Sequence, residues 1–292
     1  MWAAPLVLVR FLLNFRVARK SSAIFWHSRL LSLSRVIKVK KKKQECQNEL
    51  LDKAIAYATQ KHKGQVRKGT TKPYITHPLE TMSILNYMQA DTNLLIAGVL
   101  HDVIEDTDGT YEEIEELFGQ DVAELVGEHS EDKSKSWDER KQYAIDELKV
   151  APIRVKMLVL ADKVANLRSM CIDFKKCGYE LWERFNAPWD KQAWYYSGIQ
   201  DALSELQSLP ETSEIYWEMV ARFKDLFVEF YIDEEGETLY QVCADSSIWM
   251  LKKEVCEWIP VKDAVDGLTP LPRYRAEFIE DVWNEMRVKN YN

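Results

Sequence analysis

The stretch LLIAGVLHDVIEDT, residues 94–107, places adjacent His101 and Asp102 at the polar end of an apolar run. Residues four apart share one face of a helix, so Glu105 follows His101 there and Asp106 follows Asp102. We therefore expect one helix over residues 93–105. A solvated helix end is the simpler interpretation. Because buried charges are costly unless they are paired or bound to a metal, the pattern favours half of a metal site.

Two further stretches supply candidate ligands. HKGQVRKGTTKPYITHP (62–78) ends in His77-Pro78, and VKMLVLADKVANLRSM (155–170) is an apolar helical pattern that turns polar at Asp162. The candidate metal ligands are His77, His101, Asp102 and Asp162. Two imidazole nitrogens and two carboxylates suit Mn²⁺, Fe²⁺, Co²⁺ or Zn²⁺. Because the set contains no cysteine, we do not expect a closed structural zinc site.

The order His, His-Asp, Asp resembles the ligand signature of HD-domain metal-dependent phosphohydrolases. The segments GQVRKGTTKPYITHP, HDVIEDT, YEEIEELFG and LADKVANLRS are similar to the hydrolase domain of RelA/SpoT proteins and of the small alarmone hydrolases. Those enzymes remove pyrophosphate from the 3′ position of ppGpp and pppGpp, usually with Mn²⁺. The resemblance covers residues 46–228 and implies an all-α HD-domain helical bundle that binds a nucleotide and a divalent metal.

The same resemblance implies roles for residues around the metal. Glu105 and Asp106 are expected to position or deprotonate the attacking water, which suits carboxylates one turn from the ligands. Their alternative role is to orient the histidine ligands. Arg67 and Lys68 are expected to contact the substrate, with a solvated loop as the alternative. Asn166 is expected to bond a sugar or phosphate oxygen, or else to orient its own helix.

Apolar spacing beyond residue 44 predicts a chain of helices. They are expected at 47–62, 78–88, 93–105, 111–119, 120–129, 138–148, 153–168, 189–206 and 213–230, with a loop over 171–188. Thr110 and Glu113 have the spacing of a capping box. The HD domain is expected to span 46–230. A turn signal, EEGE, between two aromatic and β-branched runs predicts that residues 231–292 form a small α+β appendage ending in a helix.

Charge is unevenly distributed along the 292 residues. Residues 1–44 contain 11 Lys or Arg and no Asp or Glu, whereas the remainder has a net charge of −19. An acidic body does not fit a nucleic-acid binder. The small-molecule nucleotide that we expect as the partner is what the resemblance implies. The N-terminal extension, residues 1–45, has three interpretations: a transit peptide, a membrane-surface segment, or a stretch outside the working protein. Its apolar run Ala3–Val9 is too short to span a membrane.

The five cysteines form no CxxC pair, and their odd number predicts reduced thiols and a cytoplasmic protein. Three functions remain open. The first is a (p)ppGpp 3′-pyrophosphohydrolase, which would only degrade the alarmone because no synthetase region follows. The second is an HD-family phosphohydrolase acting on another nucleotide or phosphate ester. The third is a non-enzymatic nucleotide binder, against which the complete ligand set argues.

Overall fold

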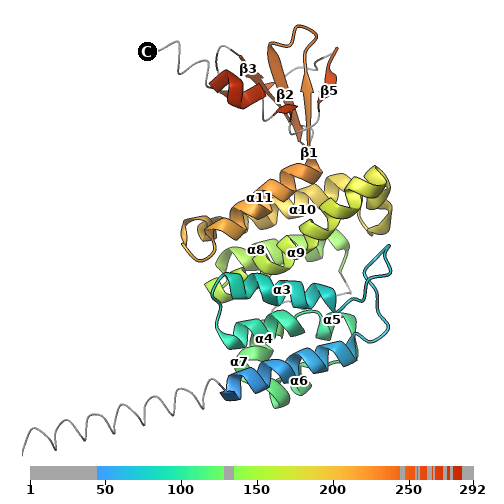
Figure 1. Cartoon of the computed structure of the whole chain (residues 1–292), viewed down its shortest axis with the longest axis vertical. Coiled ribbons are helices and arrows are strands. Elements are labelled where there is room, and N and C mark those ends of the chain that lie inside the picture. Colours follow the sequence, from blue (N-terminus) through green and yellow to red (C-terminus); the bar gives the residue numbers. More distant parts are fainter. Residues whose placement is uncertain are drawn as a thin grey trace, which may run out of the picture. The chain divides into compact units, whose positions relative to one another are not determined.

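The computed structural model in Figure 1 describes residues 45–127, 135–243, 247–253, 255, 257–261, 265, 267–271, 275–276 and 279–284. The chain divides into two units, residues 1–52 and 53–292. Within the first unit only residues 45–52 are described, and they are helical. Apart from Glu45, the predicted N-terminal extension therefore lies outside the described residues, as do its three interpretations.

Most of the described chain as far as residue 227 is helical. The helices are residues 45–61, α3 (Thr76–Tyr87), α4 (Thr92–Leu100), α5 (Val103–Asp106), α6 (Tyr111–Phe118), α7 (Gln120–Gly127), α8 (Trp137–Val150), α9 (Ile153–Cys177), η2 (Gly178–Arg184), α10 (Trp189–Ala202), η3 (Ser204–Ser208) and α11 (Ser213–Phe227). In this described part, the one strand-like contact is an isolated bridge between Val66 and Pro73. The prediction that this part of the chain is helical is thereby confirmed.

Helix α9 forms the centre of the bundle. It packs against α3, α4 and α11, and it lies between α3 and α11 in Figure 1. Its side chains Leu158, Leu160, Val164 and Leu167 are fully buried. Burial of each such side chain stabilises the fold by about 1.5–3 kcal/mol. The apolar run that precedes Asp162 in sequence therefore anchors this carboxylate inside the protein.

The helix that we predicted over residues 93–105 is in fact two helices. Helix α4 ends at Leu100, His101 and Asp102 form a turn, and α5 begins at Val103. Asp102 has φ −91° and ψ −4°, which bends the chain away from regular helix. The backbone N–H of Asp106 still donates to the carbonyl of Asp102 at 2.9 Å. The two carboxylates therefore remain one turn apart, as expected.

The loop predicted over residues 171–188 is wrong for most of its length. Helix α9 continues through Cys177, and η2 follows directly. Met170 and Cys171 are buried, so the inward face of the helix persists beyond its polar turn. Gly178, at φ +58°, ends α9 because a left-handed residue cannot continue the helix.

The predicted capping box at Thr110 and Glu113 forms only in part. The hydroxyl of Thr110 accepts from the backbone N–H of Glu113 at 3.2 Å. The Glu113 carboxylate instead accepts from Tyr57 and pairs with Lys61. A complete capping box caps α8, where Ser136 and Glu139 bond each other reciprocally. Both arrangements satisfy N–H groups that a helix start would otherwise leave open.

Five antiparallel strands follow α11, in the order β4-β3-β2-β1-β5. They are β1 (Val228–Ile232), β2 (Thr238–Cys243), β3 (Ile248–Lys252), β4 (Trp258–Val261) and β5 (Thr269–Leu271). Gly236, at φ +72°, lies in the predicted turn between β1 and β2. Phe230, Leu239 and Leu251 from the sheet and Ala276 and Trp283 from the terminal helical segment form one small core. A small sheet-and-helix appendage therefore follows the bundle, while the exact boundary at 230/231 stays a prediction.

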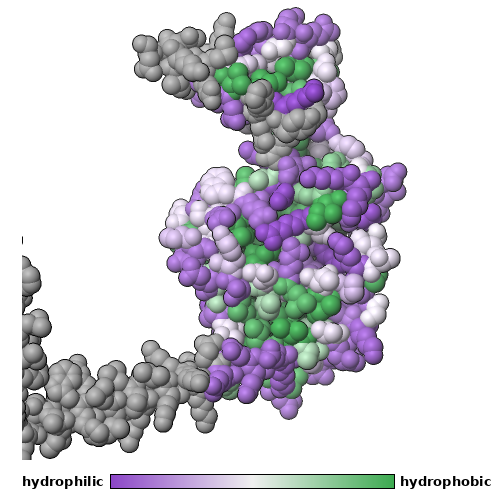
Figure 2. Space-filling view, viewed as in Figure 1, coloured by the Kyte–Doolittle hydropathy of each residue, from purple (hydrophilic) through white to green (hydrophobic). Residues whose placement is uncertain are grey.

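Hydrophilic side chains dominate the visible face of the helical bundle, with apolar groups between them (Figure 2). Several large apolar side chains are exposed, including Tyr143, Trp194 and Trp217. Within the described ranges, every helix is too short or too polar to cross a membrane.

Candidate metal centre

Three separate elements bring the four candidate ligands together. His77 comes from α3, His101 and Asp102 from the turn between α4 and α5, and Asp162 from α9. Asp162 Oδ1 lies 3.0 Å from His77 Nε2 and 3.6 Å from His101 Nε2. Asp102 Oδ2 lies 3.5 Å and 3.2 Å from the same two nitrogens. The potential ligand atoms of His77, His101 and Asp162 all lie within 4.8 Å of one another.

The ring of His101 presents its Nε2 atom to the cluster. Its Nδ1 lies 2.9 Å from the carbonyl oxygen of Gly98, which can only accept, so Nδ1 carries the proton. Its buried Nε2 makes no hydrogen bond of good geometry with any described residue. In the neutral ring this nitrogen has a lone pair that points at carboxylate oxygens. A cation between them would remove the repulsion, so the four residues fit a divalent metal.

The electrostatics of the cluster agree with this fit. Burial by itself raises the pKa of Asp162, but Lys163, at 2.7 Å, and the two histidines outweigh it and hold that pKa well below its ordinary value. Burial lowers the pKa of His101, yet Asp102 and Asp162 raise it well above its usual range. The metal-free cluster therefore keeps both carboxylates ionised and holds a proton on imidazole. A metal ion would replace that proton.

Tyr74 connects the candidate ligands to Asp106, a contact that our sequence reasoning missed. Its hydroxyl lies 2.8 Å from Asp102 Oδ2 and 2.8 Å from Asp106 Oδ2. Burial and these two carboxylates raise the pKa of Tyr74 well above its ordinary value, so the phenol stays protonated. The other predicted carboxylate, Glu105, lines the cavity at the cluster. The only sequence signal for Tyr74 was its place in a loop three residues before His77.

Arg67 and Asn166 reach the cluster through hydrogen bonds. Arg67 Nη2 donates to Asn166 Oδ1 at 2.8 Å, and Asn166 Nδ2 donates to Asp162 Oδ1 at 2.7 Å. The loop that carries Arg67 turns at Gly69, where φ is +68°. Lys68 is exposed and lines a neighbouring, smaller cavity. The structure thus brings Arg67 and Asn166 to the candidate ligands and leaves Lys68 farther out.

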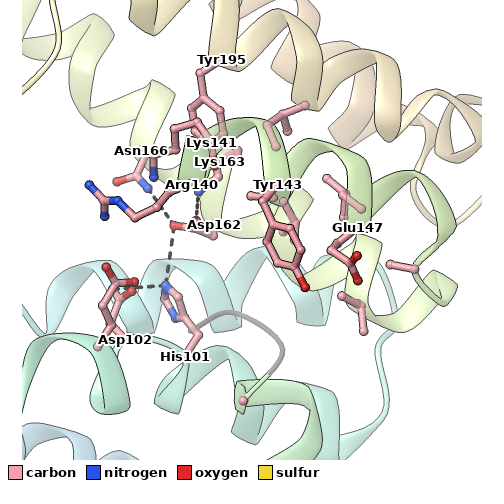
Figure 3. A pocket seen from close by; sticks show the side chains of 18 of the residues that line it. His101, Asp102, Arg140, Lys141, Tyr143, Glu147, Asp162, Lys163, Asn166 and Tyr195 are labelled. Atoms are coloured by element: carbon pink, nitrogen blue, oxygen red, sulfur yellow. Dashed lines mark hydrogen bonds and ion pairs between the residues drawn. The ribbon is translucent and has the colours of Figure 1, made fainter. Parts of the chain in front are cut away.

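A cavity of about 750 Å³ opens over the cluster. Figure 3 shows His101 and Asp102 on one side, and Asp162 with the basic side chains Arg140, Lys141 and Lys163 of α8 and α9 on the other. A second cavity, of about 370 Å³, shares several lining residues with the first. The shared residues are Arg67, Tyr74, Glu105, Arg140, Lys141, Lys163, Asn166 and Tyr195. The two cavities therefore adjoin around the basic side chains.

Sequence reasoning missed Arg140, Lys141 and Tyr195 as residues of the cavity. Arg140 and Lys141 lie on α8, and Tyr195 lies on α10. The ammonium group of Lys141 lies 4.8 Å from the centre of the Tyr195 ring, within the range of a cation–π contact. In sequence, two basic residues on a polar helix look like any solvated face. Only the packing of α8 and α10 places them at the cavity.

The relatives of this chain fall in one family. The HD domain family matches residues 54–183. Guanosine-3′,5′-bis(diphosphate) 3′-pyrophosphohydrolase MESH1 of Xenopus tropicalis is 43% identical over 136 residues, which are 46% of this chain and 74% of that protein. The Drosophila melanogaster MESH1 is 40% identical over 122 residues, 41% of this chain and 68% of the relative.

Two other comparisons extend the likeness. The bifunctional (p)ppGpp synthase/hydrolase SpoT of Escherichia coli K12 is 42% identical over 132 residues, which are 43% of this chain and 19% of SpoT. A solved structure described as a metazoan ortholog of SpoT that hydrolyses ppGpp superposes with a TM-score of 0.50 at 29% identity. It covers 60% of this chain and 94% of the solved chain. The part that matches the HD domain family, residues 54–183, contains His77, His101, Asp102 and Asp162.

Proposed function

The chain belongs to the HD-domain family of MESH1, and on that premise we propose that it hydrolyses the 3′-pyrophosphate of ppGpp and pppGpp. The products are GDP or GTP and pyrophosphate. The observation that carries the proposal is the buried His77, His101, Asp102 and Asp162 cluster that opens into a cavity with basic walls. A cavity of about 750 Å³ is in the size range of small-molecule sites.

We assign the metal to these four side chains and propose Mn²⁺ as the ion. Nitrogen and carboxylate donors together suit Mn²⁺ among other divalent metals. A bound divalent ion would supply Lewis-acid activation of the reacting phosphate and acidify a water. The hydrogen bond from His101 Nδ1 to Gly98 fixes the ring so that Nε2 faces the site. Such outer contacts orient a ligand before the metal arrives.

Glu105 and Asp106 are the proposed carboxylates for the attacking water. Asp106 lies one turn beyond Asp102, and the hydroxyl of Tyr74 lies within hydrogen-bond distance of both carboxylates. One of the two carboxylates would orient the water and take its proton. The water oxygen bonds to the phosphorus attached at the ribose 3′ oxygen. The bond from that phosphorus to the 3′ oxygen breaks, and the oxygen takes up a proton.

The basic residues of the cavity would bind the substrate's phosphates. Arg67 presents a planar fork for phosphate, and its bond to Asn166 holds it close to Asp162. Lys68 lies on the same loop, facing the smaller cavity. Arg140 and Lys141 line both cavities from α8. Because ppGpp carries a diphosphate on both the 3′ and the 5′ oxygen of its ribose, the several cations that line the two adjoining cavities support this substrate class.

We propose that the reaction takes place in the cytoplasm. Cys46, Cys171, Cys177 and Cys243 are all free thiols, which supports a reducing compartment. The substrate is a nucleotide rather than a nucleic acid, in keeping with the acidic body of the chain.

A product assay on the full chain tests the function. Incubation of ppGpp with protein and Mn²⁺ is expected to give equal amounts of GDP and pyrophosphate. Asp102→Ala and removal of metal with a chelator should each abolish the reaction, whereas Asp121→Asn, outside the cavity, should retain it. Release of orthophosphate from a range of nucleotides, without turnover of ppGpp, would instead identify another HD-family phosphohydrolase. Equal turnover of adenine and guanine substrates would also contradict the proposal.

A further inference from the structure

Tyr74 occupies the junction between the candidate metal ligands and the proposed catalytic carboxylates. A phenol hydroxyl has one hydrogen to donate, yet two carboxylate oxygens lie 2.8 Å from it. One belongs to Asp102, a proposed ligand, and the other to Asp106, a proposed partner of the water. The hydroxyl therefore bridges two groups that have different tasks, and its one hydrogen is shared between them.

The ring of Tyr74 is itself held in place by the ring of His62. It stacks on the buried ring of His62, with centroids 4.8 Å apart and planes inclined by 29°. His62 Nδ1 lies 2.7 Å from Gln65 Oε1. Gln65 Nε2 in turn donates to the carbonyl of Asp106 at 2.8 Å. Tyr74, His62, Gln65 and Asp106 thus form a closed circuit of contacts.

The backbone strengthens this circuit. The N–H of Tyr74 donates to the carbonyl of Gln65 at 3.0 Å. The N–H of Asp106 donates to the carbonyl of Asp102 at 2.9 Å. Asp106 is exposed, so without these contacts its side chain would sample several rotamers in water. Two independent tethers, one to the side chain and one to the backbone, limit that freedom.

We propose that Tyr74 is a positioning residue, whose hydroxyl fixes Asp106 against Asp102 so that the water partner and the metal ligand keep one geometry. The inference rests on the proposed function for its effect on turnover. Its effect on metal binding does not depend on the substrate. A residue that orients a ligand or a catalytic group changes metal affinity or activity by about 10–100-fold when its contact is lost.

Tyr74→Phe tests the proposal, since it removes the hydroxyl and keeps the ring that stacks on His62. We expect kcat for ppGpp to fall by about 10–100-fold while KM changes by less than about threefold. We expect the affinity for Mn²⁺, measured by calorimetry without substrate, to fall as well. Tyr57→Phe is the matched control, because Tyr57 also donates to a carboxylate, Glu113 at 2.7 Å, but lines neither cavity.

A double-mutant cycle separates positioning from general structural damage. If Tyr74 acts through Asp106, the residual kcat of Tyr74→Phe combined with Asp106→Asn should equal that of Asp106→Asn alone. Multiplicative losses in the double variant would overturn the proposal. So would wild-type kcat and Mn²⁺ affinity in Tyr74→Phe. A wild-type protein that binds Mn²⁺ but leaves ppGpp intact would refute the proposed function, and the calorimetric comparison would still decide the role of Tyr74.

Gln65→Met provides a second variant should Tyr74→Phe fail to fold, as thermal unfolding would reveal. It removes the side-chain bonds of Gln65 to His62 and to the Asp106 carbonyl, while the proposed ligands keep their own contacts. A fall in kcat with unchanged KM supports the circuit. Unchanged kcat overturns it.

Discussion

Two clusters of acidic and nitrogen-bearing side chains in this protein differ in what surrounds them. The buried cluster comprises His77, His101, Asp102 and Asp162, with side chains 2–17% exposed. The surface cluster joins Arg154 to Asp91 and Asp121, with side chains 37–57% exposed. In the surface cluster one guanidinium donates to both acids, and the surrounding water screens the negative charge that remains.

The buried cluster of four side chains contains no guanidinium. Its histidine nitrogens face carboxylate oxygens, and His101 Nε2 lacks a well-formed hydrogen bond among the described residues. Similar residue types at similar distances therefore do different things. A solvated pair contributes little to stability and needs no partner. In the buried cluster, the lone pair of a neutral imidazole points at carboxylate oxygens, and a cation between them removes the repulsion. Burial and the direction of the ligand atoms therefore distinguish a candidate metal site from a surface ion pair.

The largest expected effect comes from removing a ligand. Asp102→Ala should lower kcat for ppGpp by more than about 100-fold, because loss even of an outer contact to a metal ligand costs 10–100-fold. Asp121→Asn, the matching change in the surface cluster, should leave kcat within about twofold of wild type. Steady-state rates with saturating Mn²⁺ measure both. Comparable losses in the two variants would erase the distinction between the clusters.

Metal removal should affect stability through the buried cluster alone. A ligand present at 100 times its Kd stabilises the native state by about 2.7 kcal/mol. For a domain of this size that free energy raises Tm by about 5–11 °C. Thermal unfolding with Mn²⁺ and with chelator should therefore show such a shift in wild type and in Asp121→Asn. Asp162→Asn should show a much smaller one, and a full shift in that variant would contradict the assigned ligands.

Arg67 should contribute to substrate binding. Its guanidinium bonds Asn166 and lines both cavities, so Arg67→Ala is expected to raise KM by about 10-fold, the effect of losing one charge-assisted contact of roughly 1.4 kcal/mol. Arg67→Lys should recover only part of this, since an ammonium lacks the planar fork. Arg154→Ala is the control from the surface cluster. A rise in KM there as large as that of Arg67→Ala would point to a global effect.

The smallest effect should be the pH dependence of the surface cluster. The bond from Arg154, together with one from Asn93, lowers the pKa of Asp121 to about 2. A lowered pKa in the folded state stabilises the protein above the unfolded pKa of about 3.9, and this contribution fades as the pH falls toward 2. Wild type should therefore be more stable than Asp121→Asn at pH 7, by less than about 1 kcal/mol in the free energy of unfolding because the pair is solvated, and its Tm should be slightly higher. The two melting curves should converge near pH 2, and a gap that widens on acidification would reverse the assignment.

Local pattern predicted most of the helical bundle. The apolar spacing before Asp162 predicted a helix, and Thr110 predicted the start of α6. The local pattern did not predict the turn at His101 and Asp102. Apolar periodicity over fourteen residues does not reveal a turn that is only two residues long. Nor did it predict that α9 extends to Cys177. The polar residues after Met170 obscured a face that tertiary packing keeps buried.

The candidate site divides in the same way. His77, His101, Asp102 and Asp162 were identified by residue type and spacing, and the fold brings them together. Arg140, Lys141 and Tyr195 could not be identified, because only the packing of α8 and α10 turns them toward the cavity. Tyr74 lies in the segment GQVRKGTTKPYITHP, but its hydrogen bonds to Asp102 and Asp106, 28 and 32 residues away, are tertiary contacts. The pairing of β5 with β1 is likewise a non-local contact that no local pattern specifies.

Anomalous diffraction from crystals grown with Mn²⁺ tests the central claim most directly. We predict a single strong manganese peak within bonding distance of His77, His101, Asp102 and Asp162. No peak is expected at Asp91 and Asp121. Absence of manganese from the buried cluster, or a peak of equal strength at the surface acids, would contradict the account.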